Sequence, residues 1–223
     1  GLSNGTSYTF NVWAINAFGY SSPSSPSASL SPAAQYAYML GFQSTNRERV
    51  SIVSSGNSAN FGTLSDGSRV FHGATSSSTR GIVGGSDLTT NDFLYWTLAS
   101  TGVTQTFGDA ASSGNCRMSG NATRAISARS AADNNSIEYL TIASTGNTTD
   151  FGDAVSTIAN RGAVSNNTRG VFAAGSTFTG STNLFNNIEY ITIAATGNGT
   201  DFGDMLFTGR WRTGCSSGHG GLH

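Results

Sequence analysis

Apolar and polar residues alternate over short stretches of this chain, and no window has the spacing of an amphipathic helix. Residues 137–142 read Ile-Glu-Tyr-Leu-Thr-Ile, with apolar groups on both faces, which is typical of a strand that has neighbours on each side. Another apolar stretch follows each of three Thr-Arg pairs, at Arg80, Arg124 and Arg169, and closes on small residues. The pattern predicts a protein built from short β-strands.

Internal repetition is the strongest feature of the sequence. Residues 137–153 return as residues 188–204, and two weaker copies precede them. The Phe of each Phe-Gly pair falls at positions 61, 107, 151 and 202, so the repeat is about 45 residues long. We expect the segment from Thr-Gly-Asn to Asp-Phe-Gly-Asp to be a turn whose Phe returns to the core. Short strands, Gly-rich turns and this period are typical of a four-stranded propeller blade.

The order of these pieces resembles a kelch repeat: an apolar strand, a Gly-Gly pair, a loop, a strand with a central Tyr, a turn and an aromatic residue. Phe replaces the usual kelch Trp, and the glycine pair is intact only at Gly84-Gly85. The resemblance covers about residues 36–223 and implies kelch-like β-propeller blades, four here or part of a larger ring. The Phe-Gly-Asp motif is also similar to repeats in tail-associated virion proteins of marine bacteriophages.

The start of the chain has a different character. Residues 8–16 alternate as a half-buried strand does, Asn16 to Gly19 predicts a hairpin turn, and the Ser/Pro-rich residues 21–30 predict an edge strand. With Gly-Leu-x-x-Gly-Thr-x-Tyr at its start, this stretch resembles the last two strands of a fibronectin type III domain. We therefore expect residues 1–33 to be the end of such a domain with its linker, and residues 34–223 to be an incomplete set of propeller repeats.

One loop differs in length between the repeats. Arg124 and Tyr139 are 15 residues apart, whereas Arg169 and Tyr190 are 21 apart, so the extra residues lie within 176–187. Equivalent propeller loops share one face, and insertions on one face often mark a binding surface, although ordinary loop drift explains the pattern equally well. The candidate binding-loop residues are Asp87, Asp92, Asp133, Asn134, Phe178, Leu184 and Phe185.

Few patterns indicate a metal or a catalytic group. Oxygen ligands for Ca²⁺ are offered weakly by Asp150, Asp153, Asp201 and Asp204. The first two repeats lack the full set, and Asp also caps turns without a metal, so we expect no cofactor. The Arg of each Thr-Arg pair is expected to tie blades together through carbonyl groups or an Asp of a neighbour, with an anion-binding ring as the alternative. The cysteines, Cys116 and Cys215, are expected to be buried free thiols.

Composition narrows the classes of partner. The net charge is −1 and only 10% of residues are charged, which gives no basic surface for nucleic acid or anionic lipid. No apolar run is long enough to span a membrane. The 37% of hydrophobic residues are arranged periodically, which argues against disorder.

The resemblance to repeats of bacteriophage virion proteins implies a non-enzymatic structural or binding module of a bacteriophage tail, fibre or appendage. Its partners would be other virion proteins, a host surface glycan or protein, or a further copy of the chain, met by weak loop contacts that sum to avidity. The location would be the virion or an extracellular surface. A bacterial adhesin or filament spacer is the alternative, and a carbohydrate-active enzyme with two carboxylates is the second alternative.

Overall fold

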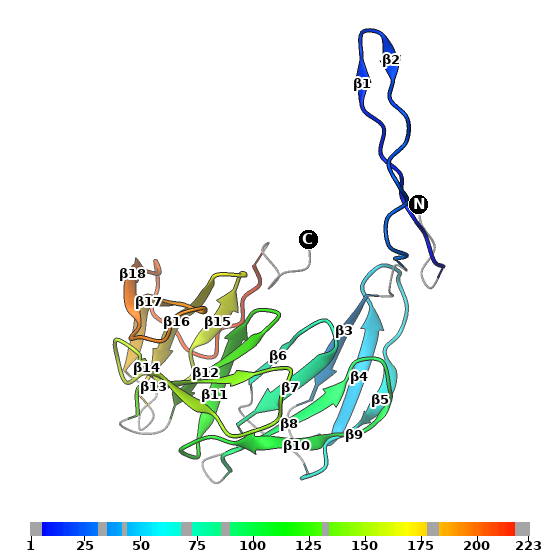
Figure 1. Cartoon of the computed structure of the whole chain (residues 1–223). Helices are drawn as coiled ribbons and strands as arrows, with labels where there is room; N and C mark the ends of the chain where they lie inside the picture. The colour runs from blue at the N-terminus through cyan, green and yellow to red at the C-terminus, as the bar shows by residue number, and fades with distance from the viewer. Residues whose placement is uncertain are drawn as a thin grey trace. The chain divides into compact units, whose positions relative to one another are not determined.

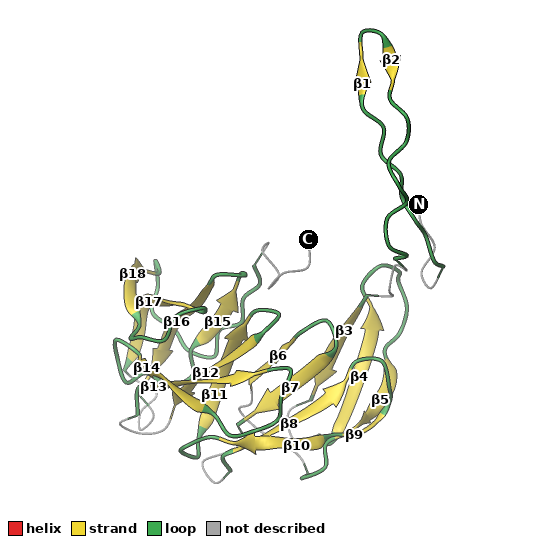
Figure 2. Cartoon of the chain, viewed as in Figure 1, coloured by secondary structure: helices red, strands yellow, loops and turns green. Residues whose placement is uncertain are grey.

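The computed structural model describes residues 6–30, 35–41, 44–67, 73–85, 90–130, 134–177 and 183–216. Every regular element within these ranges is a β-strand, and none is a helix that could cross a membrane (Figure 1, Figure 2). The chain forms two compact units, Gly1–Met39 with Glu48–Asn60 and Leu40–Arg47 with Phe61–His223. The predicted all-β class is confirmed.

Each of the last three repeats folds into one antiparallel four-stranded sheet, here called a blade. The second blade contains β6 (Gly73–Ser76), β7 (Arg80–Gly84), β8 (Asp92–Thr97) and β10 (Gln105–Asp109). The third contains β11 (Asn115–Gly120), β12 (Arg124–Ser130), β13 (Ser136–Thr141) and β14 (Thr149–Asp153). The fourth contains β15 (Gly162–Ser165), β16 (Arg169–Ser176), β17 (Leu184–Thr192) and β18 (Thr200–Asp204). The first repeat supplies β3 (Tyr36–Leu40), β4 (Asn46–Ser51) and β5 (Ala59–Thr63), followed in sheet order by β9 (Gly102–Val103).

The first strands of the three complete blades lie next to one another. β11 contacts both β6 and β15, so the sheets stand side by side in the manner of propeller blades (Figure 1). These inner strands are the elements that the sequence pattern did not identify, because they are short and carry mostly small or polar residues.

The Phe-Gly-Asp segments differ from the prediction. They belong to strands β10, β14 and β18 rather than to turns, and a bulge beside the central strand accommodates each glycine. The Phe side chain returns to the core at Phe61, Phe107 and Phe151, which are buried, whereas Phe202 is 54% exposed. In the three complete blades each ring meets the Tyr of its own blade edge to face, with centroids 6.0 Å apart for Tyr139 and Phe151.

One Asn just before or near the start of the third strand closes the sheet of each complete blade. Asn135 Nδ2 donates to Ala154 O at 3.1 Å, and Ala154 N donates back to Asn135 O at 2.7 Å. Asn91 with Ala110 and Asn186 with Met205 repeat both bonds. The outer strand is thereby fixed at its end in all three complete blades.

The Arg of the Thr-Arg pair connects neighbouring blades. The guanidinium of Arg124 lies 4.5 Å from the ring centre of Tyr139, and Arg124 Nη1 donates to Ile193 O of the fourth blade at 2.8 Å. Arg80 likewise donates to Ile142 O of the third blade at 3.0 Å. These bonds confirm, for Arg80 and Arg124, the prediction that the arginines tie blades together through carbonyl groups.

A second contact joins successive blades, and we call it the blade junction: the Thr-Gly-Asn turn of one blade lies along the Phe-Gly-Asp strand of the preceding blade. Gly197 N donates to Phe151 O at 2.7 Å, and Asp153 N donates to Asn198 Oδ1 at 3.0 Å. Gly152 has φ of 140°, and a Cβ there would lie 2.5 Å from the Gly197 carbonyl. Only glycine fits this position, because the backbones approach too closely for a side chain. The junctions at Phe107 with Gly146 and at Gly62 with Gly102 follow the same plan.

Hydrophobic residues fill the space between the sheets. One cluster joins the second and third blades through Ile82, Phe93, Phe107, Met118 and Leu140. Another joins the third and fourth through Ile126, Ile137, Phe151, Phe172 and Ile191. Complete burial of one such side chain contributes about 1.5–3 kcal/mol, so the blades depend on their neighbours for much of their stability.

Residues 6–30 form a two-stranded hairpin in the smaller unit. β1 (Ile15–Asn16) pairs with β2 (Gly19–Tyr20), and Phe18 N donates to Asn16 Oδ1 in the predicted turn. Farther along, Tyr8 pairs with Leu30. The assignment of this hairpin to a fibronectin type III domain stays a prediction.

Candidate functional site

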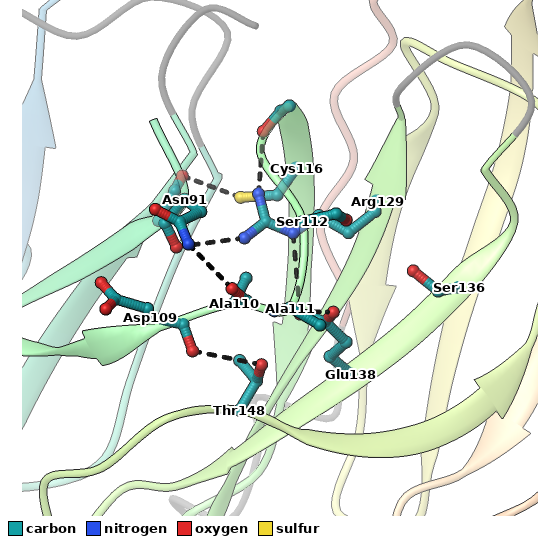
Figure 3. A network of polar contacts seen from close by, with 12 residues as sticks. Asn91, Asp109, Ala110, Ala111, Ser112, Cys116, Arg129, Ser136, Glu138 and Thr148 are labelled. Atoms are coloured by element: carbon teal, nitrogen blue, oxygen red, sulfur yellow. Dashed lines mark hydrogen bonds and ion pairs between the residues drawn. The ribbon is translucent and has the colours of Figure 1, made fainter. Parts of the chain in front are cut away.

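A hollow of about 330 Å³ lies between the second and third blades. Its wall combines the connection after β10 with strands β13 and β14. The lining residues are Ala111, Ser112, Asn134, Ser136, Glu138, Thr148 and Asp150. Hydroxyl, amide and carboxylate groups therefore converge on one concave surface, part of which is shown in Figure 3. Such groups can form hydrogen bonds with a polar ligand.

The carboxylate of Glu138 is held by the surrounding fold. Glu138 is 3% exposed, Ala111 N donates to its Oε1 at 3.2 Å, and Arg129 Nε lies 3.7 Å from its Oε2. Arg129 in turn donates through Nη1 to Gly114 O and through Nη2 to Asn91 O (Figure 3). This network spans both blades, so Glu138 forms a rigid rear wall of the hollow.

The fourth blade repeats the buried acid with a different cation. Glu189 occupies the position of Glu138, accepts from Val155 N at 2.7 Å, and pairs with Arg161. Arg161 comes from the start of the blade, whereas Arg129 comes from β12. Burial lowers the pKa of Arg161 to about 10, so Arg161 stays protonated at neutral pH.

Other blades place uncharged residues at the positions of Glu189 and Arg161. In the second blade Leu94 takes the place of the acid and is buried. In the third blade the position of Arg161 is taken by Cys116, whose Sγ donates to Gly84 O at 2.7 Å. Both buried carboxylates among the described residues, Glu138 and Glu189, are thus paired with an arginine, as the cost of burying an unpaired charge requires.

The residues predicted to form binding loops lie in different parts of the structure. Asn134 lines the hollow, where its Nδ2 donates to Ser112 Oγ at 3.0 Å. Asp92 lies on β8, opposite Asp109 of β10. Asp87, Asp133 and Phe178 lie outside the described residues.

Leu184 and Phe185 are not loop residues, which corrects the prediction. Both belong to β17, where Leu184 pairs with Ser176 and Phe185 pairs with Gly175. β16 passes through a bulge at Ala174, which has φ of 56°, and continues to Ser176. Most of the insertion therefore lengthens β16 and β17. The connection between these strands consists of residues 177–183 instead of the predicted 176–187.

The candidate calcium ligands are dispersed. Within the described residues no three His, Cys, Asp or Glu side chains gather in a group that could hold a metal ion. Asp150 lines the hollow, while Asp201 Oδ1 accepts from Gly203 N at 3.2 Å in a local turn. Asp153 and Asp204 are the last residues of β14 and β18. The nearby Asn198 uses its Oδ1 in the blade junction.

Two further points went beyond the sequence prediction. Glu138 forms the rear wall of the hollow and was not among the predicted site residues. The available signal was an acid in a strand otherwise apolar on both faces, since such a position predicts burial with a cation. The prediction of two buried thiols was half wrong: Cys116 is buried, whereas Cys215 is exposed, and both are free.

Comparisons with known proteins show the fold. No protein-family model matches the chain, and no curated protein matches it. Among solved structures, one titled "Structure of YjhT", a β-propeller protein, is similar with a TM-score of 0.64 and 9% sequence identity. The match covers 91% of this chain and 67% of that chain. At this identity the similarity concerns the architecture alone, and it supports the conclusion that the chain has an all-β propeller fold.

Proposed function

We propose that the chain is a non-enzymatic binding module, and that it serves in a bacteriophage tail, fibre or appendage. The observation that carries the binding role is the hollow between the second and third blades, with Ser112, Asn134 and Asp150 in its wall. Hydroxyl, amide and carboxylate groups on a rigid frame suit the hydroxyl groups of a surface glycan, or a polar loop of another virion protein.

The commitment of Glu138 to structural contacts favours binding over catalysis. An acid that takes part in hydrolysis must reach the substrate oxygen, whereas Glu138 is oriented by Ala111 N and Arg129. One observation favours the enzyme alternative, namely that Asp150 lines the same hollow and supplies a second carboxylate.

A glycan array tests the binding role. We expect Asn134→Leu, which removes the amide but keeps the size, to weaken binding of a captured glycan on the order of tenfold. Asn167→Ala is the control. Asn167 is exposed in the turn before β16 and does not line the hollow. If both variants bind the glycan equally well, the hollow is not the binding site.

Two further measurements separate the alternatives. Release of reducing ends from a bound polysaccharide, abolished by Asp150→Asn, would establish the enzyme and contradict the proposed role. Genes for capsid and tail assembly beside the coding gene would support the virion, whereas genes for cell-surface export would favour the bacterial adhesin.

A further inference from the structure

The hollow between the second and third blades is acidic. The described residues that line it include two carboxylates, Glu138 and Asp150, and neither Lys nor Arg. Glu138 on β13 lies opposite Asp150 on β14, so the two side chains share one face of the sheet. Like charges directly opposite each other destabilise a sheet, and a positive group beside them offsets this repulsion. The pair therefore favours a cation in the hollow.

The arginine behind Glu138 leaves part of the carboxylate unused. Ala111 N donates to Oε1, whereas Arg129 Nε lies 3.7 Å from Oε2, which is too far for a hydrogen bond (Figure 3). Glu138 Oε2 accepts no hydrogen bond from any described residue, although Glu138 is buried. Ser136 Oγ, on the same face of β13, is likewise buried without a hydrogen-bond partner in the described part of the chain. Buried polar atoms are rarely left in this state, so the wall of the hollow can accept further hydrogen bonds.

The next junction shows how an equivalent pair of acids is neutralised. Glu189 and Asp201 occupy the same positions on β17 and β18, again opposite each other. Val155 N donates to one oxygen of Glu189, and Arg161 pairs with the other. The third blade has Cys116 at the position of Arg161, so the hollow lies at the junction whose acids lack that close cation.

We propose that the hollow binds the protonated amine of an unacetylated amino sugar. An ammonium group has three N–H donors and no acceptor, which matches the three acceptors Glu138 Oε2, Ser136 Oγ and the Asp150 carboxylate. The volume of about 330 Å³ is at the low end of the range of ligand pockets, about 300–1,000 Å³, and suits a single sugar residue. This inference rests on the proposed glycan-binding function and names the class of sugar.

The rest of the lining favours a sugar over a basic protein side chain. Ser112 and Thr148 place hydroxyl groups beside the carboxylates, where they can bond to the ring hydroxyls next to the amine. A lysine side chain has only an aliphatic stem behind its ammonium group. The same carboxylates repel sugars that carry an acid, so the hollow selects by charge as well as by shape.

Isothermal titration calorimetry with two glucosamine oligosaccharides of equal length tests the proposal. One is fully deacetylated and the other fully N-acetylated. We expect the deacetylated form to bind about tenfold more tightly, because a charge-assisted hydrogen bond is stronger than a neutral one. Asp150→Asn, which keeps the size of the side chain, should remove most of this preference without changing the circular dichroism spectrum. Asp201→Asn is the matched control, since Asp201 is the equivalent acid of the fourth blade and does not line the hollow.

Equal affinities for the two oligosaccharides would overturn the proposal, and so would equal effects of Asp150→Asn and Asp201→Asn. A tetralysine peptide that binds as tightly as the deacetylated oligosaccharide, with the same dependence on Asp150, would assign the hollow to a basic protein instead. Binding of neutral or acidic glycans that Asn134→Leu weakens would overturn the amine specificity and leave the proposed binding role intact. Failure to bind any glycan would contradict both.

Discussion

Gly152→Ala will destabilise the fold much more than Gly203→Ala, although the two glycines occupy equivalent positions with similar backbone angles. Both have positive φ, of 140° and 124°, so alanine is strained at each, at a cost of about 1–3 kcal/mol. At Gly152 the new Cβ would also meet the Gly197 backbone at 2.5 Å. The turn can move away only by losing the bond from Gly197 N to Phe151 O. We expect an additional loss of about 3 kcal/mol at Gly152.

Urea unfolding, at concentrations where both variants are monomeric, measures the difference in the free energy of unfolding. Gly203→Ala is the matched control, because alanine there has the same backbone strain at positive φ but its Cβ meets no other described atom within 4 Å. Equal losses for the two variants would mean that the blade junction contributes nothing to the fold.

Removal of Arg161 will be the second severe change. Arg161→Met leaves Glu189, which is 1% exposed, without its cation, and breaking a buried pair in this way costs about 3–5 kcal/mol. The double variant Arg161→Met with Glu189→Leu removes the stranded charge as well. We expect it to recover most of the lost stability, because the second blade already has Leu94 at this position.

A double-mutant cycle of unfolding free energies provides the measurement. The expected sign is a favourable coupling between the two positions, with the double variant more stable than Arg161→Met alone. A double variant as unstable as the single one would show that Arg161 acts through its bonds to the Ile158 and Ser156 carbonyls instead.

The repeat period and the residue chemistry together predicted the blades well. The Thr-Arg strand and the Tyr strand were found because their apolar residues alternate, and the arginines were correctly expected to bind carbonyl groups. The inner strand escaped prediction, since β15 is only Gly162–Ser165 and owes its place to the neighbouring blades rather than to its own pattern. The Phe-Gly-Asp strand was predicted as a turn because glycine at positive φ is commonest in turns, whereas here the glycine relieves a collision between blades.

The candidate site was harder to predict than the fold. Asn134 was found through the alignment of loops, but Ser112 and Thr148 belong to different repeats and converge only when blades dock. Leu184 and Phe185 were misplaced because an insertion predicts a longer loop, while a bulge at Ala174 allowed the strands to lengthen. Sequence spacing does not reveal where such a bulge absorbs extra residues.

Amide hydrogen exchange at Gly146 and Gly197 tests the blade series most directly. Both lie in exposed turns, and the structure pairs their N–H groups only with Phe107 O and Phe151 O of the preceding blades. The account predicts that these two amides exchange at least ~100-fold more slowly than amides of an unstructured chain. Exchange at the unstructured rate, while amides of the central strand β13 stay protected, would contradict the docking of one blade on the next.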